Sequence, residues 1–242
     1  MTTTLIVPGL NSSGAAHWQT WFESRLTDAV RVVQPDWKRA DLPQWTSRLR
    51  REISRQKGRV VIAAHSFGVL AAVQAADDYR ERIAGALFVA PADPDKFGLT
   101  DHLPAGALGF PSFLVASLND PWLSFDGAAR LAARWGSELV DLGAAGHINA
   151  ETGYGPWPYG LALLQQLDPG VTTRPVHLGV SHGPYRSHNA NDTPVAAFTP
   201  YREAAPANNA RTNFRASFAH DARARLENNS LLKIRKWVGE RA

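Results

Sequence analysis

Residues 60–72 read Val-Val-Ile-Ala-Ala-His-Ser-Phe-Gly-Val-Leu-Ala-Ala. The apolar run stops before Ser66, and a helical pattern of alanine, leucine and valine follows at once. This order is typical of a strand, one tight turn and a helix, which together lift a serine hydroxyl clear of the backbone. Gly68 stands two residues after the serine, as this motif requires, but Ala64 takes the position that usually holds glycine. The match is partial, and a purely structural turn is the alternative.

The chain around this turn alternates between short β-like runs and helical patterns. The β-like runs cover 5–7, 30–33, 60–63, 86–89, 113–116 and 138–141, and the helical patterns cover about 15–27, 43–57, 67–79, 125–136 and 157–167. Most of the β-like runs are continuously apolar, which indicates strands buried on both faces. The pattern predicts an α/β fold with a mostly parallel sheet, helices on both faces and right-handed crossovers.

The size and composition of the chain fit one globular domain. It has 242 residues, 44% of them hydrophobic, and no cysteine, which excludes disulfides and thiolate chemistry. Its first residues lack the features of a secretory signal, and no apolar run approaches the ~20 residues of a membrane helix. We therefore expect a soluble, cytoplasmic protein that does not associate with a membrane.

The net charge of +4 is unevenly distributed along the chain. Residues 1–169 carry 15 basic and 17 acidic side chains, whereas residues 170–242 carry 11 and 5. The first segment, residues 1–169, is predicted to form the α/β domain, and its charge indicates no nucleic-acid footprint. The second is rich in proline and asparagine and predicts a poorly ordered basic extension, with an amphipathic pattern only at 221–238. Its partner is unknown, and an acidic partner, nucleic acid or membrane surface is the alternative to simple disorder.

A serine nucleophile needs an acid that orients its base, and one aspartate stands in the expected place. Asp120 follows the apolar run 111–118, just beyond the carboxyl end of a predicted central strand. Asp93 also follows a predicted strand and is the rival. We favour Asp120 because the acid is expected on the strand nearest the loop that supplies the base.

The base is predicted to be His147. This residue lies in the glycine- and alanine-rich stretch 143–149, directly after the last predicted strand. His65 is beside the serine in sequence, but neighbouring residues of a strand point to opposite faces, which makes it a poor base. The chain order of serine, aspartate and histidine is the order found in α/β-hydrolases.

Two backbone amides are needed to stabilise an oxyanion. The amide of Phe67 is the first candidate, because it follows the serine and begins a helix. The second would come from the loop after the first strand, where Gly9 allows close approach and either Leu10 or Asn11 can donate.

The same glycine-containing loop does not match a nucleotide-binding motif. It lacks the middle glycine of a dinucleotide fingerprint, and Ala15-Ala16 stands where a phosphate loop needs Lys-Ser/Thr. No metal-ligand spacing is present in the sequence. We therefore predict neither a cofactor nor a metal.

Five segments together resemble a known family. They are Val7–Gly14, His17–Glu23, Ala64–Gly68, Asn119–Pro121 and Gly146–Asn149. They are similar to motifs of the small serine hydrolases of the retinoblastoma-binding-protein-9 and YdeN type, over about residues 4–167. The resemblance implies a compact α/β-hydrolase with little or no lid and a Ser66–His147–Asp120 triad. It also implies that His17-Trp18 caps or packs the first helix.

The sequence thus predicts a serine hydrolase that cleaves acyl esters, with amides as a second class, through an acyl-serine intermediate. Phe97, Phe110, Trp122 and Phe125 are the aromatic candidates for the wall of the acyl pocket. Their alternative is ordinary core packing. A binding or regulatory protein on a hydrolase scaffold, and acyl transfer to an acceptor other than water, are the alternative functions.

Overall fold

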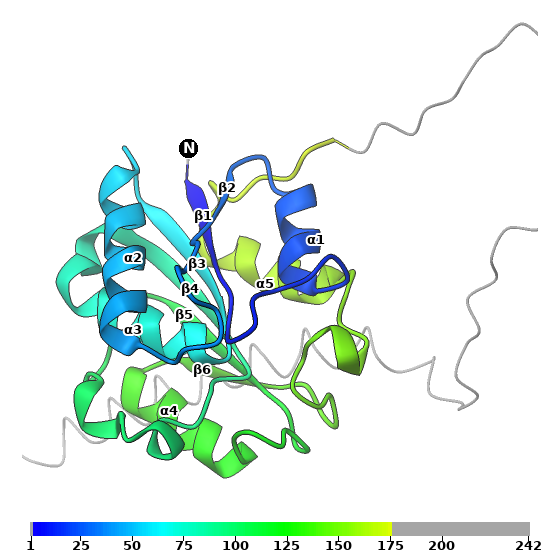
Figure 1. Ribbon diagram of the computed structural model, residues 1–242. Helices are drawn as coiled ribbons and strands as arrows, with labels where there is room; N and C mark the ends of the chain where they lie inside the picture. The colour runs from blue at the N-terminus through cyan, green and yellow to red at the C-terminus, as the bar shows by residue number, and fades with distance from the viewer. Residues whose placement is uncertain (1, 176–242) are drawn as a thin grey trace, which may run out of the picture. The chain divides into compact units, whose positions relative to one another are not determined.

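The computed structural model describes residues 2–175. Its centre is a six-stranded, all-parallel sheet with the strand order β2-β1-β3-β4-β5-β6 (Figure 1). The strands are β1 (Thr3–Val7), β2 (Ala29–Arg31), β3 (Val60–His65), β4 (Ile83–Val89), β5 (Ser112–Ala116) and β6 (Glu138–Asp141). This confirms the predicted α/β class and the parallel sheet. Because all strands run the same way, the loops after their carboxyl ends gather at one edge.

Helices cover both faces of the sheet, as predicted (Figure 1). They are α1 (Trp18–Arg25), α2 (Leu42–Arg55), α3 (Phe67–Tyr79), α4 (Phe125–Trp135) and α5 (Pro158–Leu167), with short 3-10 turns η1 (Arg80–Arg82), η2 (Asp95–Phe97), η3 (Thr100–His102) and η4 (Ala150–Thr152). Helices α2, α3 and α4 pack in one hydrophobic cluster with one face of the sheet. Helices α1 and α5 pack in a second cluster with the other face.

Strand β3 shows why the sequence forms a sheet buried on both sides. Val60, Ile62 and Ala64 belong to one hydrophobic cluster, and Val61 and Ala63 belong to the other. Successive side chains of a strand point to opposite faces, so a continuously apolar run fills both layers. This explains the absence of alternation in the sequence.

The first helix begins later than the sequence pattern suggested. It starts at Trp18, because His17 has extended backbone (φ −87°, ψ 145°) and accepts a hydrogen bond from the Gln19 amide. Helix α2 begins in a similar way, with the Asp41 carboxylate accepting from the Gln44 amide. Such caps satisfy amides that the first turn of a helix leaves unpaired.

The connection between β4 and β5 crosses the edge of the sheet where the strands end. Its only regular elements are the 3-10 turns η2 and η3. This agrees with the predicted fold with little or no lid. No helix within the described part of the chain has the length and apolar character needed to cross a membrane.

The chain after α5 folds back onto the body. Val171 is buried in the cluster of α1 and α5, and its neighbour Thr172 accepts a hydrogen bond at 2.9 Å from the Thr27 amide. The Arg174 amide donates to the Arg25 carbonyl at 2.7 Å. These contacts extend the packed body beyond the predicted boundary at residue 169. The rest of the predicted extension, including the pattern at 221–238, lies outside the described residues.

This packing predicts different stabilities for two truncated chains. The free energy of unfolding should be about 1–3 kcal/mol lower for a chain ending at residue 169 than for one ending at 175, because the shorter chain loses the buried Val171 side chain and the backbone hydrogen bonds to Thr27 and Arg25. Urea denaturation of the two proteins measures the difference. Val171→Ala in the full chain is the matched control and should account for part of the loss; equal midpoints for the two truncations would contradict the prediction.

Candidate active site

Ser66 stands at the turn between β3 and α3 in an unusual backbone conformation. Its φ of 54° and ψ of −126° lie in a region that residues with side chains rarely adopt. Hydrogen bonds fix the turn on both sides: the Ser66 amide donates to the Val89 carbonyl at 3.1 Å, and the Val69 amide donates to the Ser66 carbonyl at 3.0 Å. The surrounding structure therefore holds the strained turn that the sequence motif predicts.

Two glycines allow the loop after β1 to pass directly against this turn. A Cβ on Gly68 would lie 2.4 Å from the Pro8 carbonyl oxygen and 2.5 Å from that of Val7. A Cβ on Gly9 would lie 2.7 Å from the Ser66 Cβ. Only glycine fits at either position without moving backbone. Ala64, which replaces the usual first glycine of the motif, is fully buried in the core.

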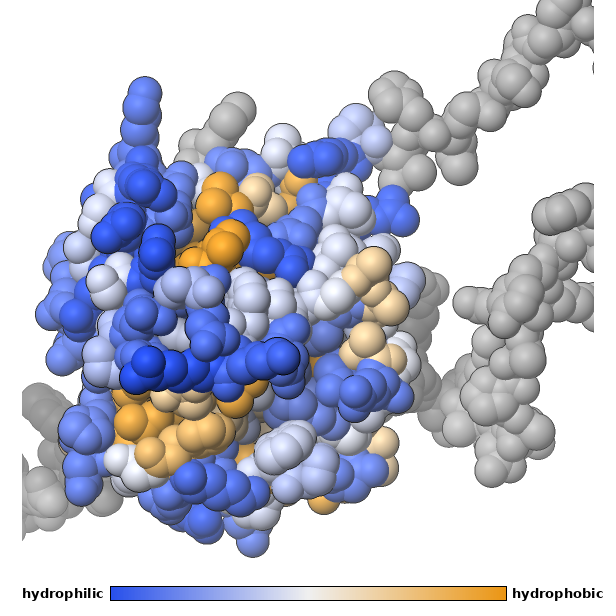
Figure 2. Space-filling model, in the orientation of Figure 1, coloured by the Kyte–Doolittle hydropathy of each residue, from blue (hydrophilic) through white to orange (hydrophobic). Residues whose placement is uncertain are grey.

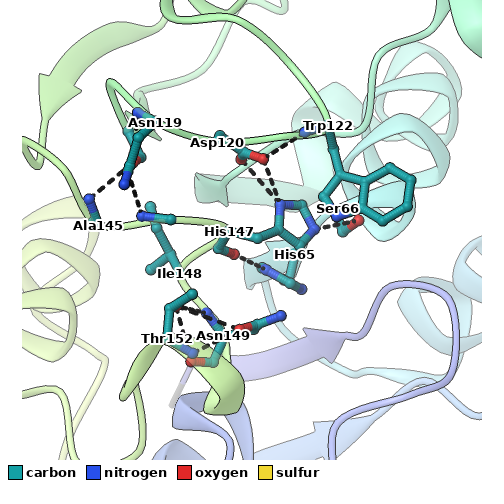
Figure 3. Close-up of polar contacts among 12 residues, drawn as sticks. His65, Ser66, Asn119, Asp120, Trp122, Ala145, His147, Ile148, Asn149 and Thr152 are labelled. Carbon is teal, nitrogen blue, oxygen red and sulfur yellow. Dashed lines mark hydrogen bonds and ion pairs between the residues drawn. The ribbon is translucent and has the colours of Figure 1, made fainter.

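The structure brings Ser66, His147 and Asp120 together (Figure 3). His147 Nε2 lies 3.0 Å from Ser66 Oγ, and its Nδ1 lies 2.9 and 3.1 Å from the two Asp120 carboxylate oxygens. A carboxylate only accepts, so Nδ1 carries the proton and Nε2 is free to accept from the serine hydroxyl. The Asp120 side chain is 3% exposed and also accepts from the Trp122 amide at 2.9 Å.

The rival acid, Asp93, lies at the same edge of the sheet and lines the same cavity. Its carboxylate accepts from the Asp95 amide at 3.0 Å, within its own loop. No hydrogen bond joins it to His147 among the residues described, whereas Asp120 makes two. The geometry therefore favours Asp120 as the partner of the imidazole.

The loop that carries His147 is anchored by side chains from the acid loop. Ser117 Oγ accepts from the Ala145 amide at 2.9 Å, and Asn119 Oδ1 accepts from the Gly146 amide at 2.7 Å. Ser117 and Asn119 also bond to each other at 2.8 Å. The acid and the base are thus placed by one hydrogen-bonded unit.

The opposite side of this loop is held from the sheet and from α1. His65 Nε2 donates to the His147 carbonyl at 2.9 Å, and Trp18 Nε1 donates to the Ile148 carbonyl at 3.0 Å. His65 was not expected to act as a base, and its ring supports the backbone of His147. The hydrogen bond to the Ile148 carbonyl also explains how the Trp18 indole nitrogen can be buried.

Three histidine rings form a row beside the serine. The centroid of His65 lies 4.9 Å from that of His17 and 4.8 Å from that of His147. Burial, reinforced by Arg31 and His147, lowers the pKa of His17 to about 4. Burial, reinforced by the other two histidines, holds the pKa of His65 well below its ordinary value. Both supporting rings are therefore neutral at pH 7.

The structure distinguishes between the two candidates for the second oxyanion amide. The Asn11 amide donates to the Trp37 carbonyl at 2.8 Å and is already used. The Leu10 amide has no backbone acceptor among residues 2–175. The Phe67 amide is in the first turn of α3, where amides are unpaired within the helix. Leu10 and Phe67 are therefore the amides available to an anion.

A cavity of about 430 Å³ opens over the triad. Ser66 and His147 line it, together with the predicted aromatic residues Phe97 and Trp122. Trp122 is 57% exposed, and its ring centroid lies 6.2 Å from that of His147 (Figure 3). The cavity is thus open to solvent on its aromatic side.

Two of the predicted pocket residues do not line this cavity. Phe110 is buried in the cluster of α2, α3 and α4, and Phe125 packs against the same cluster. The prediction was wrong for these two because their apolar neighbours place them in the core. Sequence reasoning also missed His17 and Asn149, which do line the cavity although both lie in quoted motifs.

Two further observations concern metal-binding groups and the surface of the protein. Within residues 2–175, no group of three or more histidine, aspartate or glutamate side chains is arranged to hold a metal ion. Figure 2 shows polar side chains over much of one face, interrupted by apolar patches.

Comparison with protein families places the chain in one of them. The family described as serine hydrolase matches residues 4–166, about two thirds of the chain. The chain therefore belongs to the serine hydrolase family. Comparison with curated proteins finds no significant match.

Solved structures agree with this assignment. A protein from Pectobacterium atrosepticum described as a YdeN-like hydrolase is 44% identical, with a TM-score of 0.66, over 70% of this chain and 94% of the other. The ydeN gene product of B. subtilis is 19% identical, with a TM-score of 0.59, over 69% of this chain and 98% of the other. Est1E from Butyrivibrio proteoclasticus, solved with ferulic acid bound, is 10% identical, with a TM-score of 0.53, over 70% of this chain and 88% of the other. The last two share the fold. The predicted α/β-hydrolase superfamily and YdeN-like family are confirmed.

The lowered pKa of His17 predicts how stability depends on pH. The unfolded state takes up a proton near pH 6.5, whereas the folded state resists it down to about pH 4, so the free energy of unfolding should fall as pH drops through this window. For His17 alone the loss is about 2 kcal/mol at pH 5 relative to pH 7. Urea denaturation at several pH values measures it.

The variant His17→Asn isolates this group in the same experiment. Asparagine does not titrate, so the variant should lose about 2 kcal/mol less between pH 7 and pH 5 than the unmodified protein. If the free energy of unfolding depends on pH in the same way for the two proteins, folding does not keep the His17 imidazole neutral.

Proposed function

We propose that this serine hydrolase cleaves acyl esters, with amides as a second class, through an acyl-Ser66 intermediate. The observation that carries the proposal is the continuous hydrogen-bond chain from Asp120 through His147 to Ser66. A serine hydroxyl is a weak nucleophile until an adjacent base can take its proton. The 3.0 Å contact with His147 Nε2 supports this activation.

In the first half of the reaction, Ser66 Oγ attacks the acyl carbonyl carbon while its proton passes to His147 Nε2. Asp120 holds the imidazole in the tautomer that accepts this proton and stabilises the imidazolium that forms. The tetrahedral intermediate collapses when the imidazolium gives its proton to the leaving alcohol. The acyl group remains on Ser66.

The negative charge of the tetrahedral intermediate falls on the former carbonyl oxygen. The amides of Leu10 and Phe67 are the donors that we assign to it, because the Asn11 amide is already bonded to Trp37. The Phe67 amide adds the positive end of the α3 dipole. Such preorganised donors contribute to catalysis because they need no rearrangement as charge develops.

In the second half, water enters the open cavity and attacks the acyl carbon. His147 takes the proton of the water and returns it to Ser66 Oγ as the carboxylic acid leaves. The solvent-exposed side of the cavity at Trp122 supports access of water. The same step with another acceptor would give acyl transfer, which product analysis separates from hydrolysis.

Removal of the nucleophile should abolish the activity. Ser66→Ala should lower kcat for a short-chain aryl ester by at least ~10³-fold and eliminate labelling by a fluorophosphonate probe. Ser54→Ala is the matched control, because Ser54 lies on the outer surface of α2 and bonds to Arg50 and Tyr79. A folded wild-type protein that neither hydrolyses esters nor reacts with the probe would favour the binding or regulatory alternative.

The two candidate acids are separated by matched substitutions. Asp120→Asn should lower kcat by about 10³–10⁴-fold, because the amide no longer fixes the imidazole in the accepting tautomer. Asp93→Asn should have a far smaller effect, since that carboxylate bonds within its own loop. The measurement is steady-state ester hydrolysis; a larger loss at Asp93 than at Asp120 would overturn the assignment of the acid.

A further inference from the structure

His17 is an active-site feature that the proposed mechanism does not use. It caps α1, yet its ring also lines the cavity that contains Ser66 and His147. The ring is nearly buried and packs edge-on against His65, with 4.9 Å between centroids. Capping occupies only one of its two nitrogen atoms.

The cap determines which nitrogen carries the proton. His17 Nδ1 accepts from the Gln19 amide at 3.2 Å, so in the neutral ring the single proton is on Nε2. Burial and the nearby charge of Arg31 lower the pKa of His17 to about 4, so the ring is neutral at pH 7. His17 is therefore a fixed N–H donor at pH 7.

The Nε2–H group of His17 is the part of the ring that the cap leaves free. No hydrogen bond among residues 2–175 uses this atom, and it is not one of the fully buried polar side-chain atoms that lack a partner there. His17 lines the cavity, and no described residue pairs with its Nε2–H group. This group is therefore available to a substrate that enters the cavity. A neutral donor also adds no repulsion to the imidazolium that forms on His147 during the reaction.

We propose that His17 donates a hydrogen bond from Nε2 to an oxygen of the substrate other than the scissile carbonyl oxygen. The active site then selects esters that carry an ether, hydroxyl or second carbonyl oxygen over hydrocarbon analogues of the same shape. Ser12 and Asn149 line the same cavity and give it further polar groups for such a substrate. This inference rests on the proposed function, because it concerns the substrate of the Ser66 site.

Pairs of esters that differ by one oxygen test this selection. An aryl methoxyacetate and the corresponding aryl butyrate differ in the acyl part, and 2-methoxyethyl butyrate and n-butyl butyrate differ in the alcohol part. In each pair an oxygen replaces one methylene group. The measured quantity is the ratio of kcat/KM within a pair, divided by the same ratio for hydrolysis by hydroxide. This division removes the effect of the oxygen on intrinsic reactivity.

The wild-type protein should show a corrected ratio of about three to ten in at least one pair, as expected for one neutral hydrogen bond. Corrected ratios near one in both pairs would overturn the proposal without the need for a variant. Ser66→Ala, measured in parallel, tests the proposed function separately, because it should abolish turnover of every ester. If activity survives in Ser66→Ala, the proposed function fails and this inference fails with it.

Two variants then assign the selection to His17. In His17→Asn, the amide oxygen is two bonds beyond Cβ, like Nδ1, so the cap of α1 can be kept while the Nε2 donor is lost. In His17→Gln, the amide nitrogen is three bonds beyond Cβ, like Nε2, so a donor remains while the cap is lost. The corrected ratio should fall to about one in His17→Asn and be retained in His17→Gln. A ratio unchanged in His17→Asn would overturn the proposal, because a purely structural role would change stability and not this ratio.

Discussion

The site depends on a close approach of backbone to backbone, where the loop after β1 passes against Ser66 and the first turn of α3. Gly9 and Gly68 permit this contact, since a side chain at either would collide with the neighbouring segment. The contact places the Leu10 amide near the turn that displays Ser66, and it lets the first and third strands lie side by side. Strain at Ser66 is tolerated because hydrogen bonds and packing fix the turn from several directions.

Much of this arrangement was readable in the sequence, for a physical reason. Parallel strands buried on both faces give uninterrupted apolar runs, and helix α3 was predicted with the bounds that the structure has. The positions of Asp120 and His147 could be predicted from the sequence because the carboxyl ends of neighbouring parallel strands must meet at one edge of the sheet. The start of α1 was harder to predict from the sequence, because a histidine ring caps this helix instead of one of the usual capping residues.

Other parts of the site depend on three-dimensional contacts that no local pattern encodes. Leu10 and Asn11 were equivalent in the sequence, and the carbonyl of Trp37, which arrives from after β2, distinguishes them. Phe110 ends the long connection before β5 and Phe125 begins α4, yet Phe110 is buried in the core and Phe125 packs against it. The sequence analysis set His65 aside as a base, but the bond from its ring to the backbone of His147 could not be foreseen.

The anchoring of the histidine loop by Ser117 and Asn119 has a consequence for motion at the site. These side chains belong to the segment that carries Asp120, so the carboxylate and the imidazole are parts of one mechanical body. Thermal displacement of that body changes the separation between imidazole and hydroxyl, while the pairing of imidazole and carboxylate is preserved. Because His65 of β3 also bonds to the His147 carbonyl, that body is tied to the same sheet that carries Ser66.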